Sequence, residues 1–256
     1  MIKKVVVPIS GGIDSSVLLL MAVKEYDEVH ALTFDYGQRH LREIKCADLQ
    51  VAYMKQSSNV THQTLDVRFL KDLAPTSSLT NSDIDTPDVR EVKGEAQPAS
   101  YVPNRNMLFL SIAAARAEAV GGADIWHGAT KVDSLAGYWD TDKSFMNSMN
   151  NVLILNRENV AQIKCPLLDL DKSDITHKGV ELGLMFSDTY TCYSGNMLSD
   201  ATTPSSSLRL QGFLESGYID PLLYIQQDNI NQSYKNRGCK LIEYENYPPT
   251  LIEKFG

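Results

Sequence analysis

The distribution of apolar residues along the chain predicts alternating strands and helices. A β-branched run, Val5-Val6-Val7-Pro8-Ile9, is too short for a helix and fits a strand that is buried on both faces of a parallel sheet. A second apolar run at residues 15–26 predicts a helix. The alternation continues, with strands expected at residues 29–34, 61–65, 123–128 and 163–167 and helices at 39–56, 107–120, 142–151 and 171–183. This order predicts an α/β fold with a doubly wound, mostly parallel sheet over residues 1–186, followed by a small, mainly helical C-terminal appendage at residues 187–256.

Small polar residues separate the first strand from the first helix. Glycines there let the backbone approach a ligand, and the unpaired N–H groups of the new helix favour an anion. A Walker loop would have a lysine at this place, but this loop has Asp14, and a carboxylate tolerates a triphosphate mainly when Mg²⁺ lies between them. We therefore predict a pyrophosphate site with Mg²⁺ on Asp14 and with phosphate contacts from Ser10, Gly11, Gly12, Ser15 and Ser16. The alternative is a serine–glycine turn that only caps the helix.

Polar residues also follow the second expected strand, in the segment Asp35-Tyr36-Gly37-Gln38-Arg39-His40. Ligands of open parallel sheets lie off the carboxyl ends of the strands, so we expect this segment beside the phosphate loop. Asp35 fits either a contact to ATP or an ordinary helix N-cap. His40, taken alone, fits a surface histidine better than a catalytic base.

Three later segments carry candidate site residues. Arg105 opens a helix, where its charge opposes the helix dipole and indicates a bound anion. Tyr138 and Trp139 follow a strand and fit either stacking on a flat heterocycle, with Asp140 accepting from ring N–H groups, or packing beneath a surface loop. At a strand end and a helix start, Lys164 and Lys172 either reach a triphosphate or stay solvated.

The segment 71–100 is rich in Pro, Ser, Thr and Asp and poor in large apolar residues. Such a long segment inside a compact domain is either a functional lid or disordered. Alternating aspartates at residues 83–88 lack the glycine and the distal glutamate of a calcium loop, so we interpret them as a solvated face.

Composition narrows the class of protein. The 256 residues are 43% hydrophobic, as in a globular protein, and no apolar run approaches the length of a membrane span. We expect no signal peptide, because a strand follows the first lysines directly. Four scattered cysteines, Cys46, Cys165, Cys192 and Cys239, fit reduced thiols in the cytoplasm. The net charge of −8 opposes strong nucleic-acid binding.

Ser-Gly-Gly-x-Asp-Ser-Ser resembles the loop of the ATP-pyrophosphatase superfamily, which splits ATP between its α- and β-phosphates. Further segments resemble the 7-cyano-7-deazaguanine synthase (QueC) family and occur in its order: FDYGQRH at 34–40, VPNRN at 102–106, Asp133 with GYWD at 137–140, PL at 166–167 with Lys172, TCYSG at 191–195, LR at 208–209 and DP at 220–221. The resemblance covers residues 3–221 and implies an adenine nucleotide alpha hydrolase-like fold.

The resemblance also implies a function, that of an AMP-forming, ATP-dependent C–N ligase of queuosine biosynthesis. Its substrates are 7-carboxy-7-deazaguanine, ATP and ammonia, and its products are the 7-amido compound and the nitrile, preQ0. Catalytic roles are implied for Asp14, Arg105 and Lys172, and ATP contacts for Asp35 and Lys164 in addition to the loop. Deazaguanine contacts are implied for Arg39, Tyr138, Trp139 and Asp140.

The chain departs from the family at its zinc site. Members place a C-x-x-C-x-x-C run before the Leu-Arg segment, whereas residues 201–207 here are Ala-Thr-Thr-Pro-Ser-Ser-Ser, and Cys192 alone is kept. One thiolate does not hold a structural zinc, so we predict none. Asp140-Thr141-Asp142 replaces the usual Asp-Cys-Arg and removes a positive charge near the expected substrate pocket.

Three functions stay open. The first is a synthase that yields the nitrile, the amide or both. The second is a ligase that transfers the adenylated deazaguanine to an amine of a protein or another macromolecule. The third is an inactive nucleotide-binding subunit, against which the intact phosphate loop and Arg105 count. A tail without zinc is ordered by packing, by the additional segment at 222–256 or by a partner subunit, and we expect a homodimer.

Overall fold

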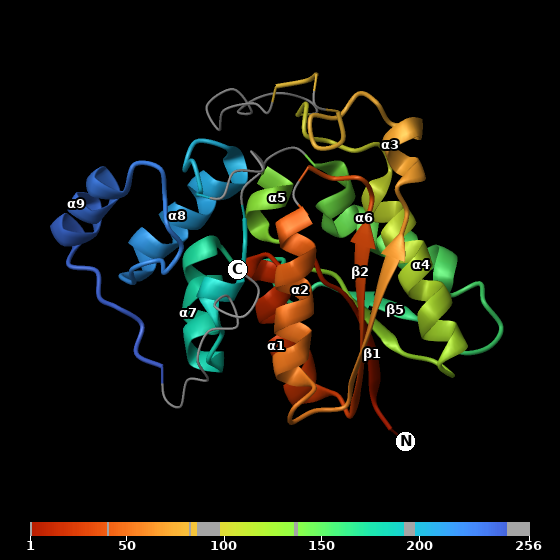
Figure 1. The fold of residues 1–256 in the computed structure, drawn as a ribbon. Coiled ribbons are helices and arrows are strands. Elements are labelled where there is room, and N and C mark those ends of the chain that lie inside the picture. The colour runs from red at the N-terminus through yellow and green to blue at the C-terminus, as the bar shows by residue number, and fades with distance from the viewer. Residues whose placement is uncertain are drawn as a thin grey trace.

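A five-stranded parallel sheet forms the centre of the fold (Figure 1). The computed structural model describes residues 2–39, 41–81, 83–85, 98–135, 138–191 and 198–244. The strands are β1 (Lys4–Pro8), β2 (Glu28–Asp35), β3 (Val60–Asp66), β4 (Asp124–Trp126) and β5 (Gln162–Lys164), in the order β3-β2-β1-β4-β5. Each neighbouring pair is parallel. The predicted α/β fold with a parallel sheet is confirmed.

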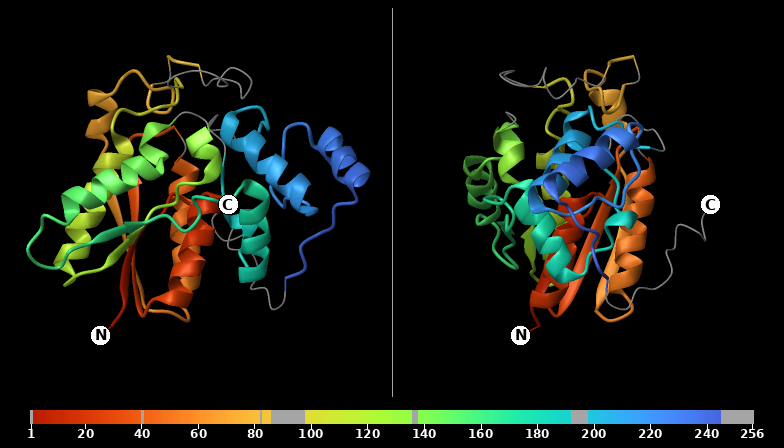
Figure 2. Two further views of the ribbon diagram at one scale, coloured as in Figure 1. Left: turned by 180° about the vertical axis from the view of Figure 1, so that it is seen from behind. Right: turned by 90° about the vertical axis from the view of Figure 1, so that its left-hand side faces the viewer.

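Helices cover both faces of the sheet, as Figure 2 shows from two further sides. One face carries α1 (Ile13–Glu25), α2 (Leu41–Met54) and α7 (Lys172–Leu182), and the other carries α4 (Arg105–Ala119) and α6 (Lys143–Leu153). Successive strand side chains point to opposite faces, so Val5 and Val7 join the core beneath α1, whereas Val6 joins the core beneath α4. Burial on both faces explains why β1 is apolar throughout.

The strand order reverses at β1. In register, Val6 pairs with His30 of β2 on one side and with Ile125 of β4 on the other. The chain runs from β1 outward to β3 and then returns to fill β4 and β5 on the opposite side. Connections that leave the carboxyl ends of two adjacent strands in opposite directions open a crevice between them, which is where ligands bind in sheets of this kind.

The C-terminal residues pack against the sheet domain through a shared core. After η2 (Phe186–Asp188) come α8 (Pro204–Ser216) and α9 (Gln227–Arg237), and Phe213, Tyr224 and Tyr234 are buried in the same cluster as Val5. The predicted helical character of this segment holds for its described part. The expected boundary at residue 186 stays a prediction.

A buried ion pair ties this segment together. Arg209 Nε lies 2.6 Å from Asp220 Oδ2, and the two side chains are 1% and 0% exposed. Arg209 also donates to Thr189 Oγ1 at 2.9 Å and to the Phe186 carbonyl at 3.1 Å, while Tyr224 donates its hydroxyl to Asp220 at 2.6 Å. Both charges are therefore hydrogen-bonded on several sides, which a buried ion pair requires.

Some short elements were not predicted from the sequence. They are α3 (Phe69–Leu73), α5 (Lys131–Leu135) and η1 (Trp139–Thr141), all shorter than the window over which a helical period can be recognised. Residues 82 and 86–97 lie outside the described residues, so a lid or a solvated loop at 71–100 stays a prediction. Within the described part of the chain, no helix is long and apolar enough to cross a membrane.

Candidate active site

The phosphate loop is closed by its own hydroxyl groups. Ser10 Oγ and Ser15 Oγ lie 3.1 Å apart, the Ser10 N–H donates to Ser15 Oγ at 3.2 Å, and the Ser16 hydroxyl donates to the Gly12 carbonyl at 2.7 Å. Gly12 is the N-cap of α1, and no side chain caps the helix there. The first N–H groups of α1 are therefore left for a ligand, and the positive end of the helix dipole favours an anion.

Gly11 is fixed by the close approach of α2. Its φ of +85° lies in the left-handed region, and a Cβ at this position would overlap the Glu43 carbonyl oxygen and lie 2.6 Å from the Ala47 nitrogen. Any side chain would force α2 away from the loop. Gly11 thus shapes the site without lining the cavity described below.

A lysine from α7 reaches the loop. Lys172 Nζ donates to Asp14 Oδ2 at 2.7 Å, while Asp14 Oδ1 is buried without a hydrogen-bond partner among the described residues. Burial alone would lower the pKa of Lys172, but the charges of Asp14 and Asp133 raise it, so the ammonium form is retained. The structure therefore brings together two of the three predicted catalytic residues.

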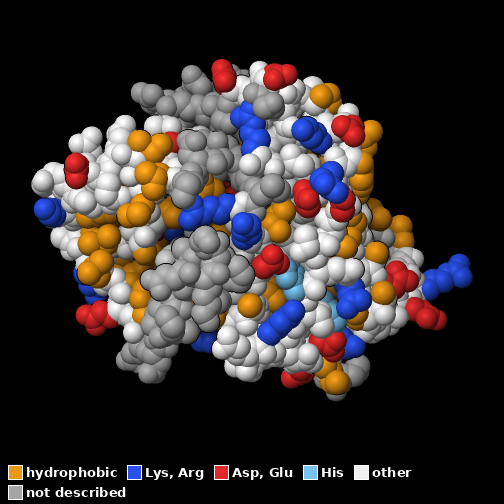
Figure 3. Space-filling model, viewed as in Figure 1, with side chains coloured by type: hydrophobic (Ala, Val, Ile, Leu, Met, Phe, Trp, Pro, Cys, Tyr) orange, Lys and Arg blue, Asp and Glu red, His pale blue; other side chains and the backbone are white. Residues whose placement is uncertain are grey.

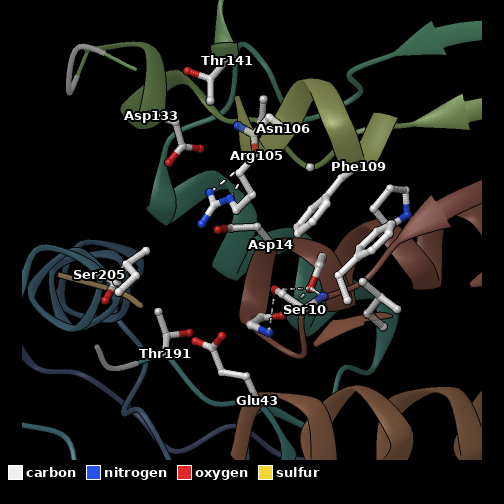
Figure 4. A pocket seen from close by; sticks show the side chains of 18 of the residues that line it. Ser10, Asp14, Glu43, Arg105, Asn106, Phe109, Asp133, Thr141, Thr191 and Ser205 are labelled. Atoms are coloured by element: carbon white, nitrogen blue, oxygen red, sulfur yellow. Dashed lines mark hydrogen bonds between the residues drawn. The ribbon is translucent and has the colours of Figure 1, made fainter. Parts of the chain in front are cut away.

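Arg105, the third, is the first residue of α4 and points into the same space, as Figure 4 shows. Its guanidinium carbon lies 5.5 Å from the centroid of the Tyr36 ring, and Nη1 donates to the Tyr36 hydroxyl at 3.4 Å. Nε donates to Asn106 Oδ1 at 3.4 Å. These contacts aim the guanidinium at the cavity from the side of the sheet opposite to α7.

A cavity of about 300 Å³ joins these groups. It opens off the carboxyl ends of β1, β2 and β4, at the point where the strand order reverses. Of the residues predicted for the site, its wall contains Ser10, Gly12, Asp14, Ser15, Arg105, Tyr138 and Lys172. Gly11 and Ser16 lie in the same loop but support it from behind, since Ser16 is 1% exposed. The predicted phosphate loop, lysine and arginine thus converge on one cavity.

Lys164 and Asp35 do not line the cavity. Lys164 is the last residue of β5, and its side chain is 44% exposed. Its Nζ pairs with Asp124 at 2.7 Å. Asp35 Oδ1 accepts from the Gly37 N–H at 3.1 Å, and Asp35 Oδ2 lies 3.8 Å from Arg68 Nε. The carboxyl is therefore turned toward the loop that follows β2. It is not the N-cap of α2, which begins at Leu41.

Three of the four predicted deazaguanine contacts also lie away from the cavity wall. Trp139 is 41% exposed and its indole donates to the Tyr101 hydroxyl at 2.9 Å. Arg39 donates to the Ile84 carbonyl at 3.4 Å. Asp140 is buried, and burial raises the pKa of its carboxyl. Tyr138 lines the cavity and hydrogen-bonds Ser100 Oγ at 2.6 Å. His40, Gly137 and Cys192 lie outside the described residues.

The fold adds wall residues that were not predicted: Glu43, His127, Thr191 and Ser205. Glu43 lies on α2 four positions before the fully buried Ala47, so a carboxylate on the buried face of this helix was the signal that could have found it. Burial raises its pKa to about 8, and Arg105 opposes this shift. Burial lowers the pKa of His127 to about 4, which keeps its imidazole neutral. Thr191 begins the TCYSG segment quoted for the family, and Ser205 lies in the stretch at 201–207 without cysteines, but neither residue was predicted to line the site.

An open parallel sheet with a phosphate loop at its switch point, faced by a lysine and an arginine, defines a nucleotide-binding α/β domain. The chain belongs to the family "Queuosine biosynthesis protein QueC", whose sequence profile matches residues 4–217. The family expected from the motifs is therefore confirmed.

Two relatives at 38% and 40% identity agree with this assignment. The chain is 38% identical over 242 residues to the 7-cyano-7-deazaguanine synthase of Thermoplasma acidophilum, covering 93% of this chain and 99% of that protein. It is 40% identical over 225 residues to 7-cyano-7-deazaguanine synthase 1 of Colwellia psychrerythraea, covering 88% and 100%. Among solved structures, NMN synthetase from Francisella tularensis is similar with a TM-score of 0.48 and 16% identity, covering 97% and 90%.

Proposed function

We propose that this chain is a 7-cyano-7-deazaguanine synthase, an ATP-dependent ligase that converts 7-carboxy-7-deazaguanine and ammonia into preQ0 and releases AMP and pyrophosphate. The observation that carries the proposal is the 2.7 Å contact between Lys172 and Asp14 beside the phosphate loop, in a chain of the QueC family. It gives the loop the positive charge that its own sequence lacks.

The chemistry explains why such a site is needed. A carboxylate does not react with ammonia, because hydroxide is a poor leaving group. Attack of a carboxylate oxygen on the α-phosphorus of ATP forms a C–O–P bond, breaks the bond to pyrophosphate and gives an acyl-adenylate. Ammonia then attacks the acyl carbon, and AMP leaves with the C–O electron pair. The oxygen of the resulting amide then attacks the α-phosphorus of a second ATP and releases pyrophosphate, and loss of AMP and of both nitrogen protons gives the nitrile.

The described residues suit the first of these steps. The N–H groups at the start of α1, with the hydroxyls of Ser10 and Ser15, hold the departing pyrophosphate. Lys172 and Arg105 face it from two sides and offset the charge that develops as the bond to the α-phosphorus breaks. Each such preorganised group is worth on the order of 10²–10³ in rate.

The acidic residue of the loop fits Mg²⁺. Oδ1 of Asp14 is buried and without a hydrogen-bond partner among the described residues, and Asp14 lines the cavity proposed for the phosphates. Magnesium is commonly held by one or two carboxylates together with substrate phosphates and water. We propose that Asp14 binds Mg²⁺ with the pyrophosphate oxygens, where the ion supplies further charge neutralisation.

We also propose that the C-terminal segment is ordered without zinc. Three of the four cysteines lie in different parts of the described fold: Cys46 in α2, Cys165 after β5 and Cys239 after α9. The buried Arg209–Asp220 pair joins the segments around Phe186 and Tyr224 by itself. Metal analysis of the purified protein tests this: we expect no stoichiometric zinc and no loss of thermal stability with a zinc chelator. Stoichiometric zinc would contradict it.

A homodimer and a cytoplasmic location stay predictions. Figure 3 shows hydrophobic side chains exposed over the region of α8 and α9. In the segment between these two helices, Leu223 is 60% and Ile225 is 56% exposed. Exposed apolar side chains of this kind are common at interfaces between protein chains. Light scattering of the purified protein distinguishes a monomer from a dimer.

The function is tested by mass spectrometry of a reaction with ATP, Mg²⁺ and 7-carboxy-7-deazaguanine, with and without ammonium. We expect AMP together with preQ0, and with the amide as its precursor, only when ammonium is present. AMP without either product would indicate a larger amine acceptor. Absence of AMP under all conditions would contradict the proposed function.

A further inference from the structure

One corner of the cavity is lined by oxygen atoms from three separate elements. Glu43 comes from α2, Thr191 follows η2, and Ser205 lies in the first turn of α8. Figure 4 shows the Glu43 carboxyl and the Thr191 hydroxyl turned toward each other, with Ser205 nearby in the same space. A Cβ built on Gly12 would lie 3.5 Å from Thr191 Oγ1, so this corner adjoins the phosphate loop.

The hydrogen-bonding capacity of this corner is unused. Thr191 Oγ1 and Ser205 Oγ are buried without a partner among the described residues. Within the same residues, no hydrogen bond or ion pair holds the Glu43 carboxyl. Buried polar atoms normally have partners, and unpartnered ones gathered in a cavity indicate a ligand that supplies them.

The chemistry of the corner defines that ligand. A carboxylate accepts hydrogen bonds, and the two hydroxyls accept as well as donate them, so the three side chains together offer several acceptors to a small group with N–H donors. In its ionised form Glu43 repels a phosphate, which disfavours a phosphate in this corner. Ammonium is the one substrate of the proposed reaction that combines positive charge, small size and N–H donors on every side.

We propose that Glu43, Thr191 and Ser205 form the ammonium site and that Glu43 accepts the proton whose removal makes the nitrogen nucleophilic. An N–H bond of ammonium breaks, its proton passes to a carboxylate oxygen of Glu43, and the freed lone pair forms the C–N bond to the acyl-adenylate. AMP leaves with the C–O electron pair, and a second proton departs to water from the new amide nitrogen. This inference rests on the proposed function.

The surroundings of Glu43 suit this role. A glutamate with an ordinary pKa is too strong an acid to take a proton from ammonium. Burial raises the pKa of Glu43 to about 8, which brings it closer to the pKa of ammonium. The ionisable groups that interact with it are Arg105 of α4, Tyr36 after β2 and Cys46 of its own helix. Arg105 lowers its pKa, and a bound ammonium ion would act in the same direction.

Glu43→Gln tests the proposal, because glutamine has nearly the same shape but accepts no proton. ATP–pyrophosphate exchange with 7-carboxy-7-deazaguanine and without ammonium measures activation alone, and amide formation at varied ammonium measures the second step. We expect exchange to change less than about twofold, whereas kcat/KM for ammonium falls about a hundredfold or more. The matched control is Asp48→Asn, an exposed carboxylate of the same helix whose removal should alter neither step.

Hydroxylamine separates proton transfer from positioning. It is neutral near pH 7, so it needs no base, and the Glu43→Gln variant should form the hydroxamate at nearly the wild-type rate. The proposal is overturned if exchange and amide formation fall equally in the Glu43→Gln variant, or if its kcat/KM for ammonium is unchanged. It is also overturned if the variant loses as much activity with hydroxylamine as with ammonium. If the wild-type protein itself shows no exchange, the proposed function fails, which is a different result.

Discussion

Lys172 and Asp14 are 158 positions apart in the sequence, yet Lys172 Nζ donates to Asp14 Oδ2 at 2.7 Å. In a Walker loop the lysine belongs to the loop itself, whereas here it comes from the first turn of α7. A capping box between Asp171 and Asp174 fixes that turn. The position of the Lys172 ammonium group beside the loop therefore depends on the packing of α7 against α1.

Replacing Lys172 by methionine should strongly impair activation of the carboxylate. The variant loses the charge that offsets the pyrophosphate and leaves Asp14 unpaired, so we expect ATP–pyrophosphate exchange to fall on the order of 10²–10³-fold. Lys178→Met is the control, because Lys178 lies on the same helix and, among the residues that the structure describes, pairs only with the exposed Glu181. A Lys172→Met variant with near-normal exchange would show that the lysine is structural.

Substitution of Gly212 in α8 should also reduce ATP–pyrophosphate exchange, although Gly212 is far from the phosphate loop in the sequence. A Cβ there would lie 2.8 Å from the Lys172 carbonyl oxygen, so Gly212→Ala must push α8 away from the start of α7. We expect a loss of about 1–3 kcal/mol in the free energy of unfolding and a displaced lysine with reduced exchange. Urea denaturation measures the first effect. The neighbouring exposed Gln211→Ala should show neither.

The buried Arg209–Asp220 pair should dominate the stability of the C-terminal segment. Arg209→Met leaves Asp220 charged and buried, so we expect the free energy of unfolding to fall by about 3–5 kcal/mol. The surface pair of Lys164 and Asp124 provides the comparison, and Lys164→Met should cost about 1 kcal/mol or less. Equal effects of the two substitutions in urea denaturation would contradict this assignment.

His127 should make stability depend on pH. Burial lowers its folded-state pKa to about 4 from 6.5, so the unfolded chain binds the proton more readily. The stabilising contribution is complete above pH 6.5 and is lost progressively as the pH falls toward 4. Compared with the wild type, His127→Gln should lose less stability between pH 7 and pH 5, which thermal denaturation at both pH values measures. An equal loss of thermal stability between pH 7 and pH 5 in the wild type and in His127→Gln would exclude this role.

The alternating apolar runs were sufficient to predict the sheet and its covering helices, because a strand such as β1 is buried on both faces and is apolar throughout. Asp14, Arg105 and Lys172 were found because each is an unusual residue beside a strand end or a helix start. The same rule also selected Lys164, which pairs with Asp124 and does not line the cavity, because the rule names the end of the sheet but not the direction of the side chain.

The rest of the cavity depends on contacts between distant elements. Ser205 lies on α8, which packs closely against the start of α7 at Gly212, and this contact leaves no local pattern in the sequence. Glu43 is placed by the absence of a side chain at Gly11. Such residues are determined by tertiary packing, which local propensity does not report.

The most direct test of the proposed activation follows an oxygen atom. A single turnover with 7-carboxy-7-deazaguanine labelled with ¹⁸O in its carboxyl group, ATP, Mg²⁺ and ammonium is analysed by mass spectrometry of the nucleotide products. If the carboxylate attacks the α-phosphorus held by the phosphate loop, one labelled oxygen appears in AMP. Label in inorganic phosphate with formation of ADP, or unlabelled AMP, would contradict it.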